Sequence, residues 1–252
     1  MEEHPGRTAE LLADLLEVCR AGLDGLDVPS DLSLRCLGGF VGFAHGQASA
    51  VLDLASARNE PAGNVVLRAL IESWITCRYI LNDDSEVRAA AYVLQPMRDS
   101  LKFLRRLRTI SDSHPENAPL VLKGAGVTSI EGLDAKISET EAALTKNEHV
   151  RALPSLEQRA QAVEAEWMYA SVYAFLFSDE VHAGARATLK FTVSHPSLSD
   201  EARATHAEKM LVTTFTLFLD FLEQASEHLG QPTESELAPF QDYRRELEGL
   251  TS

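Results

Sequence analysis

The stretch that decides the fold is NVVLRALIESWITCRYILN, residues 64–82. Drawn as a helix at 3.6 residues per turn, it is apolar around most of its circumference, which predicts a central, largely buried α-helix. Arg68 and Glu72 stand one turn apart on one face of that helix. An ion pair in a desolvated place is a weak device for stability, because desolvation offsets the Coulomb attraction. The pair is therefore either a brace to another helix or part of a binding or catalytic site.

The helical period dominates the rest of the chain of 252 residues, and the clearest candidate for an extended segment is the short piece 188–193. The pattern predicts an all-α fold, a bundle of about seven to eight mostly antiparallel helices. Helices are expected over about 8–21, 32–58, 64–82, 85–109, 129–147, 155–181, 200–229 and 234–248. We expect a single domain over 1–252, with its core over about 32–230, long loops at 110–128 and 183–198, and a C-terminal extension at 231–252.

Composition narrows the function classes. The formal net charge of −15 repels phosphate backbones, which disfavours nucleic-acid binding by the protein as a whole. Cys19, Cys36 and Cys77 form no metal-ligand spacing, and the common nucleotide and hydrolase motifs do not occur, so we predict no metal and no cofactor. The polar, acidic start and the lack of an apolar run of about 18 residues predict no membrane span and a location in the cytoplasm.

A second candidate site ends the expected helix 155–181, in YAFLFSDEVHAG, residues 173–184. Ser178 and His182 stand four residues apart and share a helix face. A helix C-terminus favours the charged form of histidine, so His182 is either a cap or a general acid or base. His45, on the glycine-rich helix 32–58, is a further candidate for lining a cavity, although a satisfied core histidine is the alternative. His149, His206 and His228 are expected on the surface.

The helix expected over 85–109 carries the one basic stripe of this acidic chain: Arg98, Lys102, Arg105 and Arg106 share one face. Such a stripe is either a solvated helix face or a strip that contacts the phosphates of RNA or of a nucleotide.

The combination of LRALIESWITCRYI with a later Y…SDEVH resembles a family of bacterial helical domains of unknown function, over roughly residues 40–190. The resemblance implies that Arg68, Glu72, Tyr79, Tyr173, Ser178 and His182 are the marked positions. That family is similar to HEPN domains, helical bundles that include prokaryotic ribonucleases of toxin and defence systems. Those ribonucleases carry an arginine shortly before the histidine on the same helix. Here the positions before His182 hold Ala174 to Phe177.

Two hypotheses follow. The first is a binding or regulatory module, in which the polar cluster is a bridge or a small-ligand pocket and the apolar helix 200–229 forms a homodimer interface as well as core. The second is a HEPN-like ribonuclease or nucleotide-processing enzyme. In it, Arg68, Glu72 and His182 are catalytic, Tyr79, Tyr173, Ser178 and His45 bind substrate, and the basic stripe contacts phosphate. The missing arginine before His182 and the acidic charge favour the first hypothesis.

Overall fold

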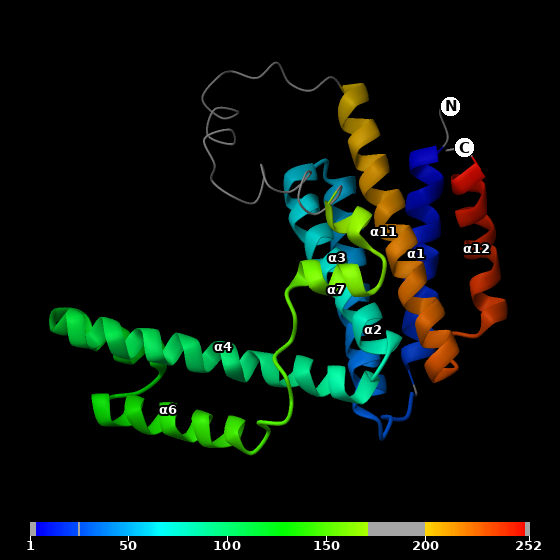
Figure 1. Cartoon of the computed structure of the whole chain (residues 1–252). Coiled ribbons are helices and arrows are strands. Elements are labelled where there is room, and N and C mark those ends of the chain that lie inside the picture. The colour runs from blue at the N-terminus through cyan, green and yellow to red at the C-terminus, as the bar shows by residue number, and fades with distance from the viewer. Residues whose placement is uncertain (1–3, 25, 171–199, 250–252) are drawn as a thin grey trace. The chain divides into compact units, whose positions relative to one another are not determined.

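A computed structural model of the chain describes residues 4–24, 26–170 and 200–249. Every secondary-structure element in these residues is a helix, which confirms the all-α prediction (Figure 1). The elements are α1 (His4–Leu23), α2 (Leu32–Ser56), α3 (Glu60–Asn82), α4 (Ser85–Ser113), the 3-10 turn η1 (Pro115–Asn117), α5 (Ala118–Ala125), α6 (Ile130–Thr145), α7 (Leu156–Ala162), α8 (Glu166–Met168), α11 (Asp200–Leu229) and α12 (Glu234–Gly249).

The contacts divide the chain into two compact units, where the sequence had led us to expect one domain. Unit 1 comprises Met1–Asp83 and Ser155–Ser252, and unit 2 comprises Asp84–Pro154. Each unit buries apolar residues of its own.

Unit 1 is built around α3 and α11. Helix α3 packs against α2, α11 and α7, while α11 also packs against α1, α2 and α12. Phe215, Phe218 and Phe221 of α11 are almost fully buried in this core. The apolar circumference of α11, from which we predicted a homodimer interface, is thus accounted for by the core of unit 1 itself.

Both ends of the chain contribute to this core, which corrects the predicted boundaries of 32–230. Leu12 and Leu15 of α1 are fully buried, and so is nearly all of Tyr243 in α12. The hydroxyl of Tyr243 lies 2.7 Å from Oγ1 of Thr8, and its ring meets that of Phe215 edge-on at 5.3 Å. Residues 234–249 are therefore an integral helix of the bundle, because α12 supplies an apolar stripe that the sequence-based boundary had left outside.

Unit 2 is a set of helices in which α5 and α6 pack on α4. Its small core is formed by Leu104, Ala125 and Leu133. The prediction of a long loop over 110–128 is wrong, because α4 continues to Ser113 and is followed by η1 and α5. Helix α5 has eight residues and ends at Gly126, whose φ of 68° closes it in the left-handed conformation that glycine adopts readily. So short a helix offers too few turns for a periodicity to be recognised.

The helix predicted over 155–181 begins as expected but is interrupted. Ser155 caps α7 with a reciprocal capping box to Gln158. The helix then ends at Ala162, and Glu164 adopts a φ of 55° before α8 begins at Glu166. The amide of Ala165 donates to the carbonyl of Ala160 at 2.9 Å, the hydrogen bond of a Schellman motif. Glutamate occupies the position where glycine usually stands, so no residue type there signals the end of the helix. The predicted loop 183–198 lies outside the described residues.

Burial also explains two of the cysteines of unit 1, Cys19 and Cys77. It raises the pKa of the Cys19 thiol to about 12 and raises that of the Cys77 thiol as well, so both stay protonated and pack as apolar groups. None of the described helices combines the length and apolar character needed to cross a membrane.

Candidate functional site

Helix α3 carries a row of polar side chains at four-residue spacing: Asn64, Arg68, Glu72 and Thr76. Asn64 and Thr76 are only 5% and 4% exposed. Nε of Arg68 donates to Oε1 of Glu72 at 3.2 Å. The arginine side chain of this pair is 20% exposed and the glutamate 43%, so the pair lies at the edge of the core. The structure thus places Arg68 and Glu72 together, as their spacing predicts.

Helix α11 contributes His206 to this row, a residue that the sequence analysis placed on the surface. It is half-buried, and its Nε2 lies 3.1 Å from Nδ2 and 3.3 Å from Oδ1 of Asn64. The two helices approach closely here because Gly63 has no side chain to meet Met210. The expectation for His206 was wrong, because the polar residues around it in the sequence give no sign that it contacts α3.

Helix α7 joins the other end of the row. The guanidinium of Arg159 donates to Oγ1 of Thr76, which itself donates to the carbonyl of Glu72 at 2.6 Å. The polar row therefore links α3 to both α7 and α11 by hydrogen bonds, and these links fix the three elements relative to one another.

The other predicted ligand-binding residues are placed as follows. Tyr79 is half-buried on α3. His45 is half-buried on α2, and its ring meets Phe218 edge-on at 6.3 Å, so it packs against the core. Tyr173, Ser178 and His182 lie outside the described residues. A meeting of Arg68 with His182 stays a prediction.

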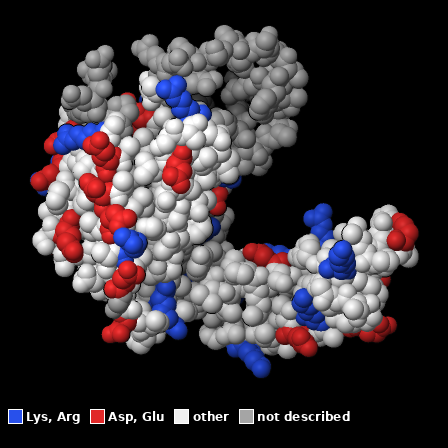
Figure 2. Space-filling view, turned by 180° about the vertical axis from the view of Figure 1, so that it is seen from behind, with Lys and Arg blue, Asp and Glu red and all other residues white. Residues whose placement is uncertain are grey.

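The basic stripe of α4 is largely neutralised within unit 2. Arg105 donates to Oε1 of Glu141 at 2.7 and 3.2 Å, Lys102 lies 3.2 Å from Asp99, and Arg98 donates to the carbonyl of Val150 at 2.5 Å. Arg106 is exposed. On the face shown in Figure 2, basic and acidic side chains are interspersed. These contacts give the stripe a structural use, holding the segment 141–150 against α4.

A third polar cluster, which was not predicted from the sequence, lies in the C-terminal half of α3. The indole Nε1 of Trp74 donates to Oδ2 of Asp220 at 2.7 Å, and Nη1 of Arg78 lies 4.0 Å from Oδ1 of the same carboxylate. The guanidinium of Arg78 also stacks 5.0 Å from the centre of the Trp74 ring. Burial is the main cause that raises the pKa of Asp220, while the Trp74 hydrogen bond and the charge of Arg78 oppose the rise. A lone aspartate inside the apolar run 210–222 was the signal that could have revealed this cluster.

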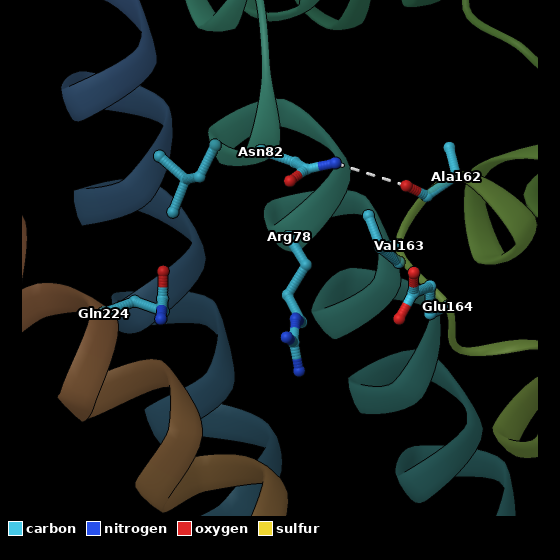
Figure 3. Close-up of a pocket in the computed structure, with 7 residues that line it drawn as sticks. Arg78, Asn82, Ala162, Val163, Glu164 and Gln224 are labelled. Carbon is cyan, nitrogen blue, oxygen red and sulfur yellow. Dashed lines mark hydrogen bonds between the residues drawn. The ribbon is translucent and has the colours of Figure 1, made fainter.

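Arg78 opens onto a cavity of about 340 Å³ in unit 1. Figure 3 shows that its walls come from α3, from the turn after α7 and from α11. Asn82 donates from Nδ2 to the carbonyl of Ala162 at 3.2 Å across this cavity. The lining residues are Arg78, Leu81, Asn82, Ala162, Val163, Glu164 and Gln224.

The side chains that line the cavity are suited to hydrogen bonding and ion pairing with a bound molecule. The described lining residues offer one guanidinium, one carboxylate and two side-chain amides, and no histidine, cysteine, serine or lysine is among them. Within the described residues, no group of three or more His, Cys, Asp or Glu side chains is placed to hold a metal ion. The geometry thus defines an all-helical protein with a preorganised polar pocket.

A comparison with models of known protein families identifies the family of this chain. Residues 35–199 match a family of unknown function (DUF5677), and the chain belongs to this family. The match covers α2 to α8 and therefore includes Arg68, Glu72, Arg78 and Glu164, but not His206, Asp220 or Gln224 of α11. The predicted resemblance to a helical family of unknown function is confirmed at this level. No curated protein and no solved structure matched the chain.

Proposed function

We propose that the protein is a non-enzymatic binding module that takes a small polar molecule with an anionic group into the Arg78 pocket of unit 1. The observation that carries this proposal is the fixing of Arg78 between the Trp74 ring at 5.0 Å and Asp220 at 4.0 Å while it lines the cavity. An arginine with contacts on two sides has less conformational freedom to lose when a ligand arrives, which lowers the entropic cost of binding.

The contacts of Asp220 support a positioning role for that carboxylate. One of its oxygens accepts from Trp74 and the other faces Arg78. Among the described residues that line the cavity, Glu164 is the one carboxylate, and no histidine, cysteine, tyrosine or lysine stands beside it to complete an acid–base pair. The arrangement therefore favours binding over catalysis.

The polar row has a place in this proposal. The hydrogen bonds of Asn64 to His206 and of Arg159 to Thr76 hold α11 and α7 against α3. Residues of α3, of α11 and of the segment at the end of α7 also line the cavity. In this proposal the Arg68–Glu72 pair is part of a brace between helices. A ligand that contacts α3, α7 and α11 together is expected to strengthen or weaken the hydrogen bonds of the polar row. Such a change in the hydrogen bonds would be the regulatory effect of binding.

A thermal-shift experiment tests the proposal. The probes are acetate, succinate, inorganic phosphate and the common L-amino acids, with the wild type and an Arg78→Met variant. A probe with a Kd of about 1 mM, present at about 10 mM, stabilises the folded state by about 1.4 kcal/mol. We expect such a shift for wild type and none for Arg78→Met. Arg35→Met, which removes an exposed arginine of α2, is the charge-matched control and should behave as wild type. Equal shifts in Arg78→Met and Arg35→Met refute the proposal.

A HEPN-like ribonuclease acting in the cytoplasm is the second candidate. One observation favours it: His206 joins the polar row beside Asn64, one helical turn before Arg68, so an imidazole and a guanidinium belong to the same cluster. The test is induced expression in a bacterial host, scoring growth and total-RNA integrity for wild type, His182→Ala and His206→Ala. Arrest with RNA degradation in wild type, abolished by either substitution, supports this candidate. Intact RNA in all three strains eliminates it.

A further inference from the structure

We infer that the ligand of the Arg78 pocket is a zwitterion of the α-amino acid class, whose carboxylate binds Arg78 and whose ammonium group binds Glu164. This inference rests on the proposed function and specifies its ligand.

The first support is the placement of two opposite charges on different walls of one cavity. Arg78 comes from α3 and Glu164 from the turn after α7, and both line the same space (Figure 3). In the part of the chain that the structure describes, no ion pair joins these two side chains. Arg78 faces Asp220 instead. A simple anion pairs with Arg78 alone, whereas a zwitterion pairs with both Arg78 and Glu164.

The second support is the orientation of Asn82. Its amide nitrogen donates to the carbonyl oxygen of Ala162 at 3.2 Å. Since a carbonyl oxygen can only accept, this bond determines which end of the amide is the nitrogen. Oδ1 of Asn82 is left as an acceptor that lines the cavity (Figure 3). An ammonium group has three donors, and Asn82 and Glu164 together supply oxygens to receive them.

The third support is the backbone at Glu164. A non-glycine residue with a φ of 55° is strained, and strain of this kind clusters at binding sites. Glycine at this position would close α7 without that strain. The side chain that causes the strain is the one that brings a carboxylate to the pocket.

The size of the cavity narrows the ligand further. About 340 Å³ lies at the low end of the range for small-molecule pockets. This volume fits one amino acid better than a nucleotide or a polymer. Gln224, from α11, adds an amide donor and acceptor for the remaining polar atoms of such a ligand.

Isothermal titration calorimetry with matched probes tests the inference. The probes are L-leucine, L-glutamine and L-glutamate, together with the N-acetyl derivative and the methyl ester of each. The proteins are the full-length wild type, Arg78→Met and Glu164→Gln, with Glu157→Gln, an exposed glutamate of α7, as the control. We expect at least one free amino acid to bind wild type and Glu157→Gln about tenfold or more tightly than its N-acetyl derivative, since a charged hydrogen bond is lost. In Glu164→Gln that difference should vanish, and Arg78→Met should bind neither form.

The outcomes separate the inference from the proposed function. If N-acetyl derivatives bind wild type as tightly as free amino acids, and Arg78→Met binds neither, the proposed function stands and the zwitterion is refuted. A tenfold preference that survives in Glu164→Gln refutes the assignment of Glu164. Failure of every probe to bind wild type overturns the inference, and the phosphate, acetate and succinate thermal shifts then decide the proposed function on their own.

Discussion

Replacing Glu164 by glycine should make unit 1 more stable. A non-glycine residue in the left-handed region costs about 1–2 kcal/mol, and glycine returns about 0.4–1 kcal/mol of that as extra entropy of the unfolded chain. The two hydrogen bonds that close α7, from Glu164 to Gln161 at 3.2 Å and from Ala165 to Ala160 at 2.9 Å, use backbone atoms and survive the substitution. We therefore expect Glu164→Gly to raise the free energy of unfolding by about 0.5–1 kcal/mol.

Urea denaturation followed by tryptophan fluorescence measures this change. Both tryptophans, Trp74 and Trp167, lie in unit 1, so the signal reports that unit. The control is Glu164→Ala, which removes the carboxylate but keeps Cβ and hence the strain, and its free energy of unfolding should stay within about 0.5 kcal/mol of wild type. The same Glu164→Gly variant should bind free amino acids no more tightly than their N-acetyl derivatives. An unfolding free energy for Glu164→Gly that equals or falls below that of Glu164→Ala refutes the argument from strain.

Three further predictions concern other parts of the molecule. The pKa of Asp220 is higher in the folded protein than in the unfolded chain, so protonation of Asp220 stabilises the fold. This stabilisation is complete below the ordinary carboxyl pKa of about 3.9, and it is lost as the pH rises through the raised pKa. Wild type should therefore gain stability relative to Asp220→Asn as the pH is lowered from about 7 to about 4, and urea titrations that show a constant difference speak against it. Leu133→Ala should cost unit 2 about 2–5 kcal/mol, because Leu133 is fully buried in its small core; hydrogen exchange should show faster exchange across 84–154, and unchanged protection there contradicts the packing. Glu141→Gln should cost less than about 1 kcal/mol, because its ion pair with Arg105 is half-exposed; a larger loss in urea denaturation means that the pair is more than a surface bridge.

The sequence predicted the starts of helices where the N-cap residue is a serine. The start of α7 at Ser155 and that of α6 after Ser129 follow from side chains that accept hydrogen bonds from the first turn. The break after Ala162 could not be predicted, because Glu164 takes a left-handed conformation that its residue type does not signal. Helix α5 was missed because it has only eight residues.

The site was predicted only in part, for a related reason. Arg68 and Glu72 are local neighbours on one helix, and spacing alone brings them together. The contacts of Trp74 and Arg78 with Asp220, and of Asn64 with His206, join residues more than 140 positions apart. Such contacts depend on how α11 lies against α3, which periodicity does not specify. For Asp220, the sequence signal is a single charged residue in a largely apolar helix face, whereas His206 stands among polar neighbours and carries no such signal.

The most direct test of the account is the emission of Trp74 itself, whose indole donates to Asp220 beneath Arg78. In a Trp167→Phe variant it is the only tryptophan, and a carboxylate that binds Arg78 changes its surroundings. Titration with L-leucine, L-glutamine, L-glutamate and acetate should give a saturable change in emission with at least one probe, and none when Arg78→Met is added to the variant. A flat response to every probe, or the same response without Arg78, contradicts the claim that this pocket is the binding site.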